Sequence, residues 1–153
     1  MDSTTNNRSF DSLFAEIDRY NDLPYRNESF STYLTRIKKG KKLSNKKLSD
    51  RTGLSESTVS RYLNGTAKHM SDEYILALIM GLELTTTQIE AALRLSGVRI
   101  DNPDLLKNRI IQFFLDRSSL YGSDKKTVAD CNCLLAKKGL DPLTNIGIDD
   151  IPD

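Results

Sequence analysis

The stretch from Leu43 to Gly65, LSNKKLSDRTGLSESTVSRYLNG, constrains the fold more than any other part of the chain. Ser44 is placed to cap a first short helix, because its hydroxyl can accept a hydrogen bond from a free backbone N–H of the first turn. That helix is expected to end near Thr52, where Gly53 suits a sharp turn with a positive φ. The stretch therefore begins with a short helix and a tight turn.

A second helix is predicted from Glu56 to about Asn64, with Ser55 as its N-cap. Its apolar side chains recur at i, i+3 and i+4 spacing and so share one buried face: Val59, Tyr62 and Leu63. Gly65 follows and tolerates the left-handed conformation that ends a helix. Two helices joined in this way match the helix-turn-helix plan, in which the second helix lies in the DNA major groove.

The run from Thr52 to Gly65, TGLSESTVSRYLNG, resembles the lambda-repressor/Cro-like (XRE-type) helix-turn-helix DNA-binding family. It matches the family's order of a small residue, Gly, an apolar residue and Ser, followed after two variable residues by Thr-Val-Ser-Arg, an aromatic residue, Leu, Asn and Gly. The resemblance implies a five-helix domain, double-stranded DNA as the partner and a homodimer on a two-part site. It also implies bacterial or phage origin.

The resemblance further implies which side chains touch DNA. The exposed start and outer face of the second helix hold the positions that usually read bases: Glu56, Ser57, Ser60 and Arg61. Asn45 falls where a Gln more often bridges phosphate and base, and Asn64 falls at a phosphate-contacting position. Lys68 belongs to a loop that runs near the DNA backbone in this family.

The distribution of charge also favours a nucleic-acid partner. Residues 30–70 contain ten Lys or Arg and two acidic side chains, a net charge of +8, whereas the whole chain carries +1. A positive segment between acidic flanks concentrates the field on one face, as phosphate contact requires. The alternative is a solvated lysine-rich loop. We add three candidate phosphate contacts from this segment: Lys46, Lys47 and Arg51.

Apolar spacing predicts further helices before and after this motif. An amphipathic N-terminal helix over about Ser9–Tyr20 is expected to cover the core or to join a dimer surface. The first helix of the DNA-binding core should run from Ser29 to about Lys39 and stop at Gly40. The apolar run Tyr74–Met80 should be a central helix, and another helix should start at Thr86 and close at Gly97.

A long helix is predicted after residue 97, with Asn102 as its cap and Pro103 at its first position. Its apolar stripe comprises Leu106, Ile110, Phe113 and Phe114. Such a stripe must be buried, either on the DNA-binding core or in a homodimer.

The last helix should span about Asp124–Lys138, with Ser123 as its cap and a helix-ending motif at Gly139. The tail from Asp141 onward is acidic and is expected to be a loop. These boundaries divide the chain into an N-terminal helical extension (1–28), a helix-turn-helix domain (29–97) and a C-terminal helical extension with an acidic tail (98–153).

The chain lacks the residue patterns that catalysis or metal binding would need. His69 is the single histidine, and a loop histidine of this kind is expected at the surface. Cys131 and Cys133 have no partners spaced for a metal or a disulfide, which favours free thiols in a reducing cytoplasm. Phosphate-loop and nucleophile motifs are missing. We expect no enzyme activity, no cofactor and no bound metal. No apolar run approaches the ~20 residues of a membrane span, and the start does not resemble a signal peptide.

The sequence thus predicts an all-α protein with a lambda-repressor-like five-helix DNA-binding core, an extra N-terminal helix and two C-terminal helices. We expect a cytoplasmic, dimeric, sequence-specific transcriptional regulator, more specifically a repressor, that reads DNA with the helix Glu56–Asn64. The alternative is a protein-interaction module, or an antitoxin-like protein, that uses the C-terminal helices to bind a partner protein.

Overall fold

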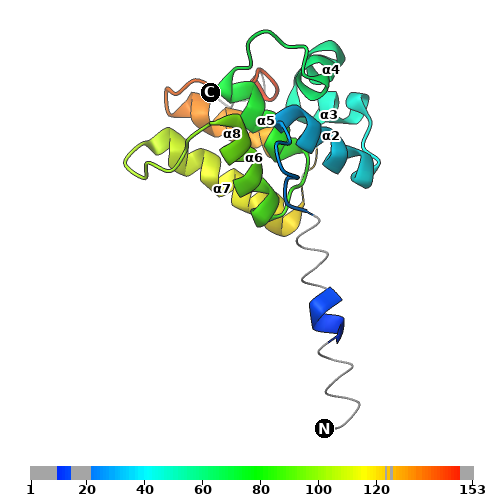
Figure 1. Ribbon diagram of the computed structural model, residues 1–153. Helices are drawn as coiled ribbons and strands as arrows, with labels where there is room; N and C mark the ends of the chain where they lie inside the picture. Colours follow the sequence, from blue (N-terminus) through cyan, green and yellow to red (C-terminus); the bar gives the residue numbers. More distant parts are fainter. Residues whose placement is uncertain (1–9, 15–21, 123, 125, 149–153) are drawn as a thin grey trace.

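Figure 1 shows the computed structural model, which describes residues 10–14, 22–122, 124 and 126–148. All regular elements within these residues are helices, and residues 10–14 form a short helical piece. The labelled helices are α2 (Phe30–Lys41), α3 (Asn45–Thr52), α4 (Glu56–Asn64), α5 (Asp72–Gly81), α6 (Thr86–Ser96), α7 (Leu106–Tyr121) and α8 (Thr127–Lys137). The all-α prediction is confirmed.

Hydroxyl side chains set the starts of the first five labelled helices. Each hydroxyl accepts a hydrogen bond from the backbone N–H three residues later, which satisfies a donor that has no partner inside the helix. The capping residues are Ser29, Ser44, Ser55, Ser71 and Thr85. The bounds of α3 and α4 agree with the sequence prediction because both ends of each helix carry a local signal.

The core is organised around α5, whose side chains from Ile75 to Met80 are all buried. Helices α3, α6, α7 and α8 all contact α5 (Figure 1). Its apolar character nearly all round follows from this central position.

The two C-terminal helices pack on α3, α5 and α6, which agrees with the first of the two alternatives raised by the sequence. Helix α7 contacts α5 and α6, and α8 contacts α3 and α5. Their buried side chains join the same apolar cluster as α5: Ile110, Ile111, Phe114, Leu115, Val128, Cys131 and Leu135. Inside this cluster Ser118 Oγ donates a 2.9 Å hydrogen bond to the carbonyl of Met80.

The prediction that Gly40 ends the first core helix is wrong. Helix α2 continues through Gly40 to Lys41, and Lys42 takes the left-handed conformation with φ 56°. The Lys42 N–H then bonds the carbonyl of Lys39 at 3.2 Å. The Lys42 side chain is exposed at this position.

The start and the stripe of α7 also differ from the prediction. Asn102 does not cap the helix; its Oδ1 accepts from the N–H of Asp104 at 3.0 Å, which closes a turn before the helix. Helix α7 begins at Leu106 without a side-chain cap. Leu106 and Phe113, expected inside, are exposed. The stripe is rotated because the outer flank of α7 has no helix packed against it in the described chain.

Helix α8 begins at Thr127, three residues later than predicted. Asp124 Oδ1 accepts from the N–H of Lys126 at 2.7 Å, and this turn occupies the segment expected to be helical. The predicted cap Ser123 lies outside the described residues. The helix-ending motif at Gly139 is confirmed. The N–H of Gly139 donates to the carbonyl of Ala136, and the N–H of Leu140 donates to the carbonyl of Leu135.

The described part of the predicted N-terminal helix does not cover the core. Residues 10–14 are helical, but the side chains of Phe10, Leu13 and Phe14 are 59%, 51% and 64% exposed. The rest of that predicted helix, including Ile17, lies outside the described residues.

Candidate nucleic-acid interface

The turn between α3 and α4 is fixed by short hydrogen bonds around Thr52. Thr52 Oγ1 donates to the carbonyl of Leu48 at 2.7 Å and accepts from the N–H of Leu54 at 3.2 Å. Gly53 has φ 80°, and Leu54 is buried below the turn. The angle between the two helices is therefore set by buried contacts.

Helix α4 is anchored by its inner face and by its C-terminal end. Val59, Tyr62 and Leu63 are buried, as predicted. On α2, Ser31 Oγ donates to the carbonyl of Tyr62, and Thr35 Oγ1 donates to that of Leu63, both at 2.6 Å. These bonds satisfy carbonyls at the end of the helix and hold its opposite face outward.

The outer face of α4 presents the predicted base-reading side chains. Glu56, Ser57 and Arg61 are exposed, and Ser60 is half-buried. The Arg61 guanidinium donates to Ser57 Oγ at 3.2 Å and to Thr58 Oγ1 at 3.3 Å. Arg61 therefore lies back along α4 toward its first turn, which is the end of a recognition helix that meets base edges.

The first turn of α3 supplies a second group of polar side chains. Lys46 and Lys47 are exposed at this helix start. Asn45 is half-buried, and its Oδ1 is buried without a hydrogen-bond partner among the described residues. An unpaired buried acceptor costs free energy, which a partner supplied by a ligand could recover.

The loop after α4 places the last two predicted contacts. Asn64 Oδ1 accepts from both the N–H and the hydroxyl of Thr66, at 3.0 and 2.6 Å, so its carbonyl side shapes the loop. Its amide NH₂ is not used in these two bonds. Lys68 and His69 are exposed in the same loop.

Arg51 is placed differently from the other candidate phosphate contacts. Its Nη1 lies 3.1 Å from Glu83 Oε1 and donates to the carbonyl of Gly81 at 3.1 Å. Only 12% of its side chain is exposed. The guanidinium thus ties α3 to the end of α5 through two contacts of Nη1, and a phosphate contact by Arg51 stays a prediction.

The segment after α8 packs directly on the helix-turn-helix motif, and the sequence prediction of a loop-like tail missed this. Thr144 Oγ1 donates to the carbonyl of Thr52 at 2.6 Å. A Cβ added at Gly53 would lie 2.7 Å from Ile146, which shows how closely the segment covers the turn. We call residues 141–148 the C-terminal strap.

Asn132 of α8 holds the C-terminal strap in place. Its side chain is fully buried. Its Oδ1 accepts from the N–H groups of Leu143 and Thr144, at 2.8 and 3.2 Å. Its Nδ2 donates to Thr144 Oγ1 at 2.9 Å and to the carbonyl of Ile146 at 3.0 Å. An Asn between the inward positions of an apolar helix was the one signal in the sequence that could have indicated this contact.

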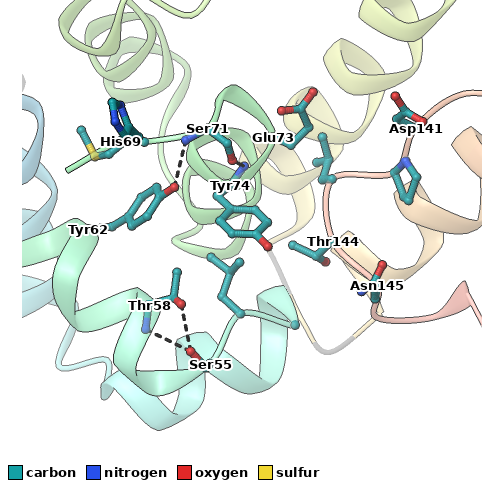
Figure 2. Close-up of a pocket in the computed structure, with 15 residues that line it drawn as sticks. Ser55, Thr58, Tyr62, His69, Ser71, Glu73, Tyr74, Asp141, Thr144 and Asn145 are labelled. Atoms are coloured by element: carbon teal, nitrogen blue, oxygen red, sulfur yellow. Dashed lines mark hydrogen bonds between the residues drawn. The ribbon is translucent and has the colours of Figure 1, made fainter. Parts of the chain in front are cut away.

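A groove runs beside α4, with a volume of about 980 Å³. Figure 2 shows Ser55, Thr58 and Tyr62 on one side and Ser71, Glu73 and Tyr74 of the α5 start on another, with Asp141, Thr144 and Asn145 from the C-terminal strap completing it. Its described lining includes two carboxylates but no Lys or Arg, so it is poorly suited to phosphate.

Both cysteines of the chain belong to α8. Cys131 is buried, and burial raises the pKa of its thiol to about 12. Cys133 is half-buried and donates through Sγ to the carbonyl of Gly147 at 2.8 Å. Both are free thiols in this structure. Within the described residues no group of His, Cys, Asp and Glu is arranged to hold a metal ion. No described helix combines the length and apolarity of a membrane span.

Comparison with protein families gives a match over residues 34–89, which fit the family described as the Cro/C1-type HTH DNA-binding domain. The match runs from the middle of α2 into α6 and includes all ten predicted contact residues. Comparisons with curated proteins and with solved structures gave no significant match.

Proposed function

We propose, from the premise that residues 34–89 are a Cro/C1-type helix-turn-helix DNA-binding domain, that the protein is a sequence-specific transcriptional regulator that reads the major groove with α4. The observation that carries this is the outer face of α4. It holds exposed polar side chains on a helix whose inner face is buried and whose end is hydrogen-bonded to α2. A helix fixed in this way can enter a groove without rearrangement.

The proposed contacts divide by role. Exposed Lys46 and Lys47 at the start of α3, with Lys68 and Asn64 after α4, would hold phosphates and fix the register. Asn45 would bridge the backbone and a base, which is the role that the resemblance implies for its position at the start of α3. Arg51 is left out of this proposed set because it is paired with Glu83.

Base reading is assigned to Glu56, Ser57, Ser60 and Arg61. The Arg61 guanidinium can pair with two acceptors of a guanine edge, and Glu56 can accept from a cytosine amino group. Both lie on the exposed side of the first two turns of α4. Glu56 also suits the positive end of the helix dipole, so part of its role is structural.

We further propose that the regulator is a dimer that represses. One helix-turn-helix reads only a few base pairs, and two related by a two-fold axis read a two-part site. A protein seated on such a site blocks access to the DNA beneath it. A reporter placed behind the bound site should lose expression when the protein is produced, and increased expression would indicate an activator.

Selection from a random-sequence DNA pool at about 150 mM salt, near physiological ionic strength, tests the proposal. Enrichment of an inverted repeat supports a dimeric reader of bases. Enrichment of a single short site supports the reader but removes the dimer. Binding that disappears with added salt and selects no sequence would reduce the interaction to nonspecific electrostatics.

A protein-interaction module is the second candidate. The observation that favours it is the set of exposed apolar side chains on α7, which packing inside the monomer does not require. If the protein is such a module, the DNA pool should give no enrichment, while one defined protein should copurify from the native host in stoichiometric amount.

A further inference from the structure

The outer face of α7 carries a regular row of exposed side chains. Their spacing of three and four residues places them on one line along the helix. The row, which we call the α7 seam, consists of Leu106, Arg109, Phe113, Asp116 and Leu120. Phe113 is 55% exposed and Leu120 is 74% exposed, while the next positions inward, including Phe114, are buried.

We propose that the α7 seam binds the α7 seam of a second copy of this chain, with the two helices antiparallel. A two-fold axis through Phe113 places the two Phe113 rings together and Leu106 near Leu120 of the second copy. The same axis brings Arg109 close to Asp116 of the second copy. Apolar positions thus meet apolar positions, and opposite charges meet.

The charges select this arrangement over the alternatives. A parallel pair would place Arg109 beside Arg109 and Asp116 beside Asp116, which is unfavourable. Arg109 has no ion-pair partner among the described residues, and Asp116 is bound on one oxygen by Gln112 Nε2 at 2.8 Å. The neighbouring Arg117 lies toward the Tyr121 ring, 5.7 Å from its centroid, and so is directed along its own helix.

The size of the seam sets the strength expected of the dimer. Sixteen residues of α7 extend about 24 Å, so the contact is confined to one helix pair. The five residues of the seam are fewer than the roughly 20–30 residues that each partner contributes to a standard interface. We therefore expect a weak dimer that forms as protein concentration rises and that is strengthened when both copies hold DNA.

Sedimentation across a wide concentration range, with no DNA present, tests the seam. The wild-type chain should change from monomer to dimer, and Phe113→Glu should remain a monomer at every concentration. Phe113 is more than half exposed, so its circular dichroism and melting temperature should stay close to wild type. Phe10→Glu, a change of an exposed aromatic outside α7, is the matched control and should still dimerise. A Phe113→Glu chain that still dimerises overturns the proposal.

Charge exchange tests the pairing of Arg109 with Asp116. Arg109→Asp and Asp116→Arg should each weaken the dimer, because each places like charges together. The double variant should recover dimerisation. If the losses of dimerisation free energy in the two single variants simply add in the double variant, Arg109 and Asp116 do not meet, and this register is overturned.

Cysteine cross-linking tests the direction of the helices. Phe113→Cys should form a disulfide with its own copy, because it lies on the two-fold axis. Leu106→Cys alone should not, since about 21 Å separates the two ends of the seam, whereas a mixture with Leu120→Cys chains should cross-link. Self-linking of Leu106→Cys would indicate a parallel pair and overturn the proposal. Deletion of residues 1–21 should leave the dimer intact. Loss of the dimer on this deletion would place the contact in the N-terminal segment and would also overturn the proposal.

The position of the seam also has a consequence for DNA, and this step rests on the proposed function. Figure 1 shows α7 along the lower edge of the body and α4 at the upper right, away from it. An operator-binding dimer on adjacent half-sites holds its two recognition helices ~34–36 Å apart. Binding to a selected inverted repeat that Phe113→Glu leaves unchanged would exclude the seam as the operator-binding dimer. Dimerisation without any DNA selection would instead remove the proposed function and leave the seam.

Discussion

Arg61 has two competing roles at the interface, and they predict different patterns of loss. If its guanidinium pairs with a guanine edge, Arg61→Ala should lose about 1–3 kcal/mol of binding free energy on the selected operator. On operators in which that base pair is already substituted, the same change should cost almost no binding free energy. The hydrogen bonds to Ser57 and Thr58 direct the side chain toward the first turn of α4, which favours this result.

Binding measured on the selected operator and on a set of single-base variants decides the matter. Equal weakening on every variant, with a shallower dependence on salt, would assign Arg61 to a phosphate.

Asn132 is the residue on which the C-terminal strap depends most. Asn132→Ala leaves the buried N–H groups of Leu143 and Thr144 without their acceptor. At about 1–3 kcal/mol for each of these two unsatisfied groups, we expect a loss of about 2–6 kcal/mol in the free energy of unfolding. Urea denaturation measures it. Asn145→Ala, an exposed amide of the same strap, is the control, and an equal loss in both variants would contradict the role given to Asn132.

At the scale of single elements, the two ends of α3 should respond to mutation in different ways. The double change Lys46→Ala and Lys47→Ala should lower the slope of log K against log salt by about 0.9 for each phosphate that the variant no longer neutralises, without affecting stability. Arg51→Ala should leave that slope unchanged and lower stability instead, because it breaks the pair with Glu83 and the bond to Gly81. Affinity titrations at several salt concentrations, together with melting curves, separate the two. A changed slope in Arg51→Ala would return that residue to the interface.

The start of α2 should make part of the stability depend on pH. Arg36 holds the Glu28 carboxylate at 2.8 Å, and this hydrogen bond lowers the pKa of Glu28 below its ordinary 4.5. Since the folded-state pKa is lower than the unfolded one, the contribution is complete above pH 4.5 and is lost as pH falls through the folded value.

Comparison of wild type with Glu28→Gln checks this. The stability difference between them should be constant near neutral pH and shrink under acid conditions. A difference that does not change on acidification would mean that the carboxylate makes no net contribution.

At the scale of the whole molecule, α7 and α8 should be needed for stability of the DNA-binding part. Each large apolar side chain they bury is worth about 1.5–3 kcal/mol, and a whole domain is stable by only about 5–15 kcal/mol. We therefore expect residues 29–97 alone to unfold at a much lower temperature than the full chain, and the full chain to melt in one transition. Circular dichroism and calorimetry measure both. Two separate calorimetric transitions would show that the C-terminal helices fold independently.

Local signals were enough to predict much of the helix-turn-helix region from sequence. Ser44, Gly53, Ser55 and Gly65 act on their immediate neighbours, so their effect does not depend on the rest of the fold. The exposed face of α4 followed from the same local periodicity. One prediction failed because a neighbouring residue ended the helix instead of the expected one: Lys42, not Gly40, takes the left-handed conformation. Another failed because Asn102, the expected helix cap, accepts its hydrogen bond within a turn that precedes the helix.

The sequence by itself determined the helical type of the elements, the caps Ser44 and Ser55, the bounds of the helix Glu56–Asn64 and the family that residues 34–89 match. Only the tertiary structure decided how distant residues meet. It paired Arg51 with Glu83, seated Thr144 on Thr52 and left Phe113 outside while Phe114 was buried. The physical reason is range. A cap or a helical period is encoded within a few residues, whereas a contact across 92 positions depends on the packing of every helix between them.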